Sequence, residues 1–245
     1  MTNFVLFSLV TIAVAGVTVA ASTDNNCLDV TTVDDFDLTS YASKPWFVAQ
    51  QAENTYTPRD MNRCVKAEYN LREEPNFWGY TVDVYNSAEN SSSGRTTGGA
   101  LCADYKEDNN SELMVAPCWL PKWFAGPYWV VAYDDDAVNG YALVSGGQPK
   151  DQVDDDTTCG ANGNEQCCKT GTGINNSGLW ILTRQPTPST DLVDSVREIA
   201  RQKGFSTTSD VLFDVDHTGC GYDADDTAAS LTLTGSRRLL RSNKN

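Results

Sequence analysis

The stretch from Leu179 to Gly204, LWILTRQPTPSTDLVDSVREIARQKG, contains a short apolar strand followed by an amphipathic helix. The strand pattern covers Leu179–Thr183. Ser189 or Thr190 can cap the helix, acidic residues lie in its first turn, basic residues lie in its last, and Gly204 ends it. Its apolar residues share one face: Leu192, Val193, Val196, Ile199 and Ala200. We therefore expect this helix to pack against an apolar surface of the fold.

Seven further stretches upstream have the character of β-strands. Each is short and either apolar or alternating, and most follow one another at hairpin spacing. They cover residues 46–49, 64–69, 80–85, 97–105, 112–119, 128–133 and 140–144. With residues 179–183 the count is eight strands, which predicts an antiparallel barrel or sandwich.

The composition narrows the class of protein. The chain has 245 residues, 40% of them hydrophobic, which is enough for one sizeable core. The formal net charge of −15 argues against nucleic acid as a partner, because phosphate binding needs a basic face. His217 is the sole histidine, which argues against a Ser-His-Asp triad and a multi-histidine metal site.

Residues 1–21 have the pattern of a secretory signal peptide. The apolar run Phe4–Val19 is followed by small residues suited to cleavage before Ser22. The run is short for a membrane span, so an uncleaved anchor is the less favoured interpretation, and no later segment could cross a membrane. We expect a secreted, extracellular protein, with the endomembrane lumen as an alternative.

The cysteines agree with an oxidising compartment. All eight follow the predicted signal peptide, and the even number predicts four disulfides. No pair has the C-x-x-C spacing of a zinc site, so we expect no metal. Three sequons are candidate glycosylation sites: Asn90, Asn109 and Asn175.

We expect a single domain over residues 22–220 and a disordered tail over residues 221–245. Residues 147–177 separate the last two strands and are too long for a hairpin loop, so disulfides are expected to order this insert. Its aspartates, at 151 and 154–156, lack EF-hand spacing. A solvated acidic loop is therefore favoured over a calcium-binding or interaction loop.

Several of these segments resemble the lipocalin family, most closely the bacterial lipocalin and apolipoprotein D branch. Lys44 stands where the family has a glycine before the first strand. The matching segments are Phe36–Tyr41 with Lys44–Phe47, Tyr128–Asp134 with Tyr141–Val144, Leu179–Thr187, and Arg63–Tyr69. The resemblance implies an eight-stranded antiparallel up-and-down barrel, or calyx, with one flanking C-terminal α-helix. It also implies that Arg184 lies over the Trp46 indole at the closed end, a structural contact of about 0.5–2 kcal/mol.

Within this fold the disulfides can be narrowed. Cys102 and Cys118 flank the turn at residues 108–110 and are expected to face each other across a hairpin. The resemblance implies a bridge between Cys64 and Cys220. Cys27 is expected to pair with one of the three insert cysteines, and the other two with each other. Adjacent Cys167 and Cys168 should not pair, so the insert set stays open among Cys159, Cys167 and Cys168.

The calyx implies a binding protein for a small hydrophobic ligand such as a fatty acid, lysophospholipid, sterol, carotenoid or bilin, with no cofactor. Trp129 and Trp180 match pocket positions of the apolipoprotein D branch. Tyr69, Tyr80, Trp119 and Tyr141 lie on predicted strands and are further candidates to face the ligand. A one-residue error in register would reverse each of these assignments.

The alternative is a lipocalin-fold enzyme resembling violaxanthin de-epoxidase and acting on a carotenoid. Many cysteines and two acidic clusters, Asp134–Asp136 and Asp154–Asp156, favour it, because neighbouring like charges raise carboxyl pKa values into a useful range. Against it, the cysteine-rich block here is an insert between strands, whereas that enzyme has an N-terminal domain. We therefore expect no catalytic activity.

Overall fold

The computed structural model describes residues 27–106 and 109–222. The predicted signal peptide, residues 1–21, lies outside the described residues, and so does the predicted tail, residues 221–245, except for its first two residues.

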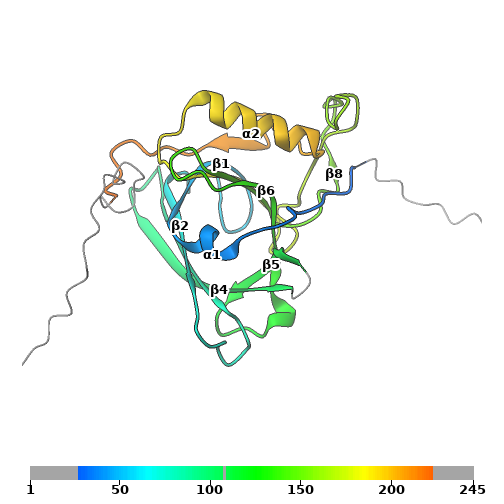
Figure 1. Ribbon diagram of the computed structural model, residues 1–245. Helices are drawn as coiled ribbons and strands as arrows, with labels where there is room; N and C mark the ends of the chain where they lie inside the picture. The colour runs from blue at the N-terminus through cyan, green and yellow to red at the C-terminus, as the bar shows by residue number, and fades with distance from the viewer. Residues whose placement is uncertain (1–26, 107–108, 223–245) are drawn as a thin grey trace, which may run out of the picture.

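Eight antiparallel strands form a closed barrel in the order in which they occur along the chain (Figure 1). They are β1 (Trp46–Ala52), β2 (Arg63–Leu71), β3 (Val82–Glu89), β4 (Thr96–Lys106), β5 (Asn109–Pro117), β6 (Gly126–Asp134), β7 (Tyr141–Ser145) and β10 (Leu179–Thr183). The last strand, β10, pairs with β1, with Phe47 opposite Thr183. The up-and-down barrel is therefore confirmed and the sandwich is excluded.

The strands divide their side chains between the barrel interior and an outer layer. The interior cluster includes Trp46, Val48, Val65, Ala67, Tyr69, Val84, Ala103, Leu113, Val130, Val144 and Leu182. The outer cluster includes Ala49, Val131, Leu143, Ile181, Val196, Ala200 and Phe205. Bulges after Val48 and after Val130 each insert one residue, so strict alternation fails in β1 and β6.

One end of the barrel is closed by α1 (Leu38–Ala42), which lies across the ring of strands in Figure 1. Below it the Arg184 guanidinium lies 3.5 Å from the centroid of the Trp46 ring. The same guanidinium donates to the backbone oxygens of Lys44 at 2.7 Å and Ser40 at 3.1 Å. Arg184 is buried, and it ties α1 to the start of β1 in the way that the resemblance implied.

The predicted helix is confirmed as α2 (Thr190–Gln202), capped by the Ser189 hydroxyl and packed on the outside of the barrel (Figure 1). Val196 and Ala200 are its buried residues. Gly204 ends the helix with φ +92°, a left-handed conformation that suits glycine. Among the described helices none is long and apolar enough to cross a membrane.

Three short elements lie outside the expected pattern. The strand β11 (Leu212–Asp214) pairs with the far half of β1, where β1 has already separated from β2. The helix α1 and the 3-10 turn η1 (Lys122–Phe124) are too short to give a periodic signal in the sequence.

The four disulfides follow the expected pairing. Cys102 and Cys118 join β4 to the residue after β5, and Cys64 and Cys220 join β2 to the C-terminal segment. In the insert, Cys27 bonds Cys168 and Cys159 bonds Cys167. No cysteine among the described residues is free.

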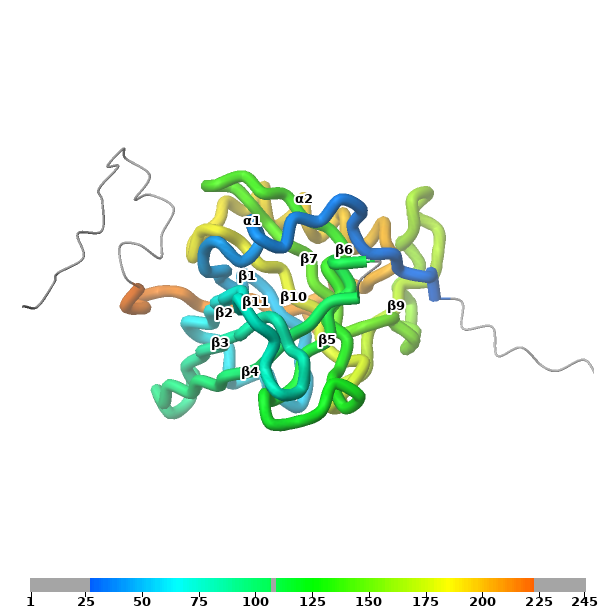
Figure 2. Tube along the Cα trace, turned by 60° about the horizontal axis from the view of Figure 1, so that its bottom comes forward, coloured from blue at the N-terminus to red at the C-terminus, as the bar shows by residue number. Residues whose placement is uncertain are grey.

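The insert is an ordered unit that packs on the C-terminal end of α2. It contains the two-residue strands β8 (Asp151–Gln152) and β9 (Cys168–Lys169), and Figure 2 shows it beside the N-terminal segment. The Cys168 amide donates to the Gly204 oxygen at 2.9 Å. Asp156 accepts from the Arg201 guanidinium at 2.8 Å and from the Ser206 hydroxyl at 2.6 Å.

Candidate ligand-binding site in the barrel

Three tyrosine hydroxyls meet inside the barrel above the floor. The Tyr128 hydroxyl lies 2.6 Å from the Tyr41 hydroxyl and 2.6 Å from the Tyr69 hydroxyl. Tyr41 comes from α1, Tyr69 from β2 and Tyr128 from β6, so the contact joins the floor to two walls. We call these three residues the hydroxyl cluster.

Burial raises the pKa of all three phenols above the ordinary value. The hydroxyl cluster is therefore neutral at physiological pH. A neutral phenol has one O–H donor and an oxygen that accepts, so each member can accept from a ligand in addition to its bond within the cluster. The cluster is a polar spot among the apolar side chains at the closed end of the barrel.

Further aromatic rings pack around the hydroxyl cluster and form the floor of the barrel. The Tyr41 ring centroid is 5.1 Å from that of Phe36, 5.1 Å from that of Trp46 and 5.7 Å from that of Tyr133. These tilted and edge-on contacts are the preferred geometry of aromatic pairs. They fix Tyr41 in position, so the hydroxyl cluster is preorganised.

A second polar site lies toward the opposite end of the barrel, where Gln51 of β1 is paired with Trp180 of β10. Trp180 packs against the interior cluster, and Gln51 has no exposed surface. The Gln51 amide nitrogen donates to the Met61 backbone oxygen at 2.9 Å. Its carbonyl oxygen is buried and has no hydrogen-bond partner among the described residues.

Asn54 lies next to this pair in the loop that follows β1. Its carbonyl oxygen accepts from the amides of Tyr56 at 2.8 Å and Thr57 at 2.9 Å. Its buried side-chain nitrogen has no partner within the described ranges. A Cβ at Gly178 would lie 2.1 Å from the Trp180 ring and 2.8 Å from that nitrogen, so the glycine permits the two side chains to approach.

Gln51 and Asn54 thus offer one unpaired acceptor and one unpaired donor beside an indole ring. Leaving a buried polar atom without a partner costs about 1–3 kcal/mol. Such atoms are therefore expected to bond water or a polar group of a ligand. The arrangement suits an apolar molecule that carries a hydroxyl, carbonyl or carboxyl group.

The structure places two of the six predicted ligand residues inside the barrel, Tyr69 and Trp180. Trp129 and Tyr141 instead pack with the outer cluster below α2. Tyr80 is buried outside the wall against Cys102. The inward orientation expected for these three tyrosine and tryptophan side chains was therefore wrong.

The error at Trp129 is one of register. Trp129 and Tyr128 are adjacent in β6 and face opposite sides of the wall, and it is Tyr128 that faces inward. The bulge after Val130 places Val131 and Ala132 on the same outer face. An extra residue of this kind leaves no signal in apolar or aromatic spacing.

Trp119 was also expected to face the ligand, and it is 73% exposed on the outside of the barrel. It follows Cys118 in the loop between β5 and β6. The same loop and the one before β3 expose further rings, and Trp78 and Trp123 have centroids 5.9 Å apart. Of these rings, Trp78 packs against the cluster that contains Cys102 and Cys118.

The two acidic clusters have structural roles. Backbone amides of Asn139 and Val138 lower the pKa of Asp136, which caps the turn between β6 and β7. Burial acts to raise the pKa of Asp156, but hydrogen bonds from Arg201 and Ser206 outweigh it and hold that pKa below its usual value. At Asp136 and Asp156 the shift in pKa is therefore opposite to the raised values that favoured an enzyme.

The three sequons differ in accessibility. Asn175 is exposed in the insert. The Asn90 amide donates to Asp60 at 2.6 Å, and the Asn109 amide donates to Thr32 at 2.9 Å. The side-chain nitrogen of Asn109, to which a glycan would be attached, therefore holds the N-terminal segment against the barrel.

No protein-family model matches the chain, and no curated protein matches its sequence. Among solved structures, the major allergen Per a 4 from cockroaches is similar with a TM-score of 0.50 and 16% identity, over 80% of this chain and 97% of that one. Insecticyanin from the tobacco hornworm Manduca sexta has a TM-score of 0.48 and 15% identity, over 82% and 89%. Lipocalin 12 from rat epididymis has 0.48 and 13%, over 83% and 99%. At these identities the likeness concerns the fold alone.

Proposed function

We propose that the protein binds and carries a small hydrophobic ligand inside the barrel. The observation that supports this most directly is the pair of unpaired buried polar atoms, on Gln51 and Asn54, beside the Trp180 ring. A packed structural core would pair these atoms or replace them with apolar groups. A ligand with a polar group would satisfy them.

The apolar wall supplies the affinity in this proposal. Burial of apolar ligand surface contributes about 25 cal/mol per Å². Four interior positions carry only a methyl group, which limits how far the protein's own side chains fill the barrel: Ala67, Ala88, Ala103 and Ala142. A fatty acid, lysophospholipid, sterol, carotenoid or bilin has the required apolar body.

The two polar sites determine the orientation of the ligand. The hydroxyl cluster lies near the floor, and Gln51 and Asn54 lie toward the other end, so an elongated ligand with polar groups at both ends can contact both. A ligand with a single polar group would choose one end. Hydrogen bonds to a fixed neutral phenol need little reorganisation of the protein.

The test is native mass spectrometry of the protein purified from its own secretion, before and after organic extraction. We expect a mass excess that extraction removes, and the released mass identifies the ligand class. An unchanged mass, with four disulfides intact, followed by no uptake of palmitic acid or retinol, would contradict the proposal.

Two variants locate the site. Gln51→Leu removes the unpaired acceptor, and it is expected to reduce the retained mass excess or weaken uptake of the same probes about fivefold. Trp119→Phe is the matched control, since that side chain lies on the outer surface. Equal effects of the two substitutions would place the ligand outside the barrel.

We also infer that the chain is a secreted lipocalin of the apolipoprotein D branch. The segments Arg63–Tyr69 and Leu179–Thr187, together with the Cys64–Cys220 bridge, support the branch. The signal pattern in residues 1–21 and the four disulfides support secretion. Expression of the full chain in a eukaryotic cell should release a protein that begins at Ser22, and retention in the cell with Met1 intact would refute secretion.

A further inference from the structure

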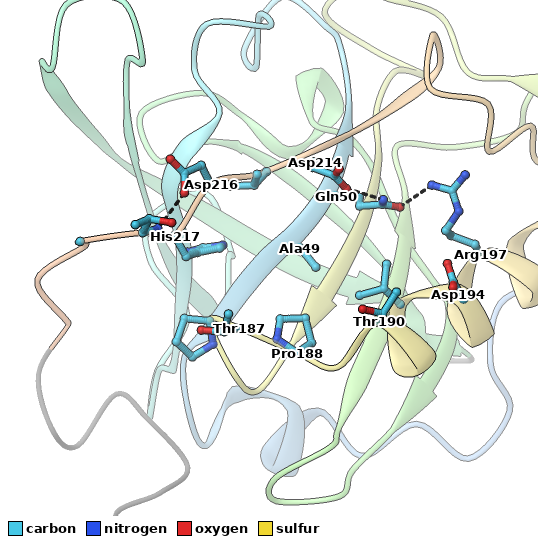
Figure 3. A pocket seen from close by; sticks show the side chains of 15 residues that line it. Ala49, Gln50, Thr187, Pro188, Thr190, Asp194, Arg197, Asp214, Asp216 and His217 are labelled. Atoms are coloured by element: carbon cyan, nitrogen blue, oxygen red, sulfur yellow. Dashed lines mark hydrogen bonds between the residues drawn. The ribbon is translucent and has the colours of Figure 1, made fainter.

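A groove with a volume of about 860 Å³ lies on the outside of the barrel, remote from the interior site. One side is the first two turns of α2 and the loop before it, and the other side is the last residue of β11 with the segment 215–219 that follows it (Figure 3). Ala49 and Gln50 of β1 form its base. Pro186, Pro188 and Val193 supply apolar surface within it.

The groove is acidic. Three carboxylates line it, those of Asp194, Asp214 and Asp216, against the single guanidinium of Arg197. That guanidinium already has two partners, because it donates to the side-chain amide oxygen of Gln50 at 3.0 Å and to the backbone oxygen of Thr207. Figure 3 shows Gln50 between Arg197 and Asp214. The lining therefore has an excess of negative charge.

Asp194 is the most available of the three carboxylates. It is exposed on α2 and makes no hydrogen bond or ion pair with any described residue. Asp216, in contrast, accepts from the Arg63 guanidinium at 2.8 Å, and Asp214 accepts from Gln50 at 2.6 Å. Each of these two still has oxygen lone pairs to share.

The described chain ends at the rim of this groove. The Tyr222 ring packs on Phe47, with centroids 4.7 Å apart, and its hydroxyl lies 2.5 Å from the His217 ring nitrogen. His217 is itself one of the lining residues. Residues 223–245 therefore continue from a point beside the groove.

The end of the sequence is complementary to the groove in charge and apolarity. Residues 227–245 contain no acidic side chain, and the last nine residues contain four basic ones. Two leucines lie between the arginines in the order Arg237-Arg238-Leu239-Leu240-Arg241. Fourteen residues lie between Tyr222 and Arg237, and this connection can reach about 50 Å when extended, so length does not prevent contact.

We propose that the segment Arg237–Arg241 docks in this groove in the same molecule. Its guanidiniums pair with the carboxylates of Asp194, Asp214 and Asp216, and its leucines cover the proline and valine surface. Arginine suits this role, since its planar group binds carboxylates with two parallel hydrogen bonds. The covalent link supplies a high effective concentration, so ion pairs of ordinary surface strength are sufficient.

The rate of trypsin cleavage after Arg238 and Arg241 in the full chain tests the proposal. A docked arginine is not available to the active site of the protease, so docking should slow this cleavage. A synthetic peptide of residues 231–245 in the same tube corrects for the effect of salt on trypsin. We expect early cleavage in the protein to be about tenfold slower than in the peptide at low salt, the effect of three surface ion pairs. Raising the salt should remove the difference.

Asp194→Lys should abolish this protection. Asp191→Lys is the matched control, because Asp191 is exposed in the same helix and changes the net charge equally but does not line the groove. Equal cleavage of the wild-type protein and the peptide would overturn the proposal. Protection that survives Asp194→Lys would mean that the segment docks at another surface. Protection that grows with protein concentration would mean that the segment docks on a second copy of the protein. Either result would overturn docking in this groove of the same molecule.

Discussion

Replacement of Tyr128 by phenylalanine removes the central oxygen of the hydroxyl cluster and keeps the ring. Two hydrogen bonds of 2.6 Å are lost, one to Tyr41 and one to Tyr69. A typical hydrogen bond contributes about 0.5–1.5 kcal/mol to stability, so the free energy of unfolding should fall by about 1–3 kcal/mol. The upper end applies if the hydroxyls of Tyr41 and Tyr69, both buried, find no other partner.

The measurement is guanidinium unfolding of the oxidised protein, followed by near-ultraviolet circular dichroism, with the unfolding slope compared between variants. Tyr85→Phe is the matched control. Tyr85 is 47% exposed on the outer face of β3, its hydroxyl bonds no described residue, and its loss should change stability by less than about 0.5 kcal/mol. If Tyr128→Phe were as harmless as Tyr85→Phe, the hydroxyl cluster would not stabilise the barrel, and its preorganisation for a ligand would be refuted.

Three further results are expected. The pKa of each phenol in the hydroxyl cluster is raised in the folded state, so its contribution to stability is complete below pH 10 and is lost as the pH rises through the folded pKa. Equilibrium unfolding at a series of alkaline pH values should therefore show a fall in the free energy of unfolding that starts above pH 10. A fall that starts near pH 8 would contradict this prediction. Arg184→Met removes the contact with Trp46 and leaves buried backbone oxygens unpaired. Thermal and guanidinium unfolding should therefore show that the free energy of unfolding falls by about 2–4 kcal/mol. A fall of less than about 1 kcal/mol would argue against a stabilising contact between Arg184 and Trp46. Of the three sequons, Asn175 should carry a glycan when the protein is made in a eukaryotic host. Enzymatic deglycosylation should then remove less mass from the Asn175→Gln variant than from the wild-type protein. Equal mass losses would exclude Asn175 as a glycosylation site.

The fold was predictable because its signals are local. The cap at Ser189, the charged ends of α2 and the stop at Gly204 lie within one continuous stretch, and the helix has the expected bounds. The Cys102–Cys118 bond was expected because the two cysteines flank a hairpin turn, and the bond is present. The register differs from the expected one, because Ala116 lies opposite Cys102 and the bond reaches two residues further, to Cys118. Neither inference depends on contacts between distant parts of the chain.

The site was only partly predictable, since its residues depend on bulges and on an element without a pattern. Tyr41 faces inward because α1 closes the barrel end, and α1 has only five residues. Gln51 faces inward because the bulge after Val48 changes the phase of β1. A polar residue within a strand would ordinarily be assigned to the outer face, and the structure reverses that assignment here.

The two long-range disulfides also determine how the molecule responds to force. Figures 1 and 2 show the described ends leaving on opposite sides, and these ends are anchored by Cys27–Cys168 and Cys64–Cys220. The shortest covalent route between them follows the 37 residues from Cys27 to Cys64 and then crosses to Cys220. When the two ends of the oxidised protein are pulled apart, the distance between them can therefore reach about 130 Å at most, however much of the barrel has unfolded. Under reducing conditions the same pull would release the whole length of chain between Cys27 and Cys220.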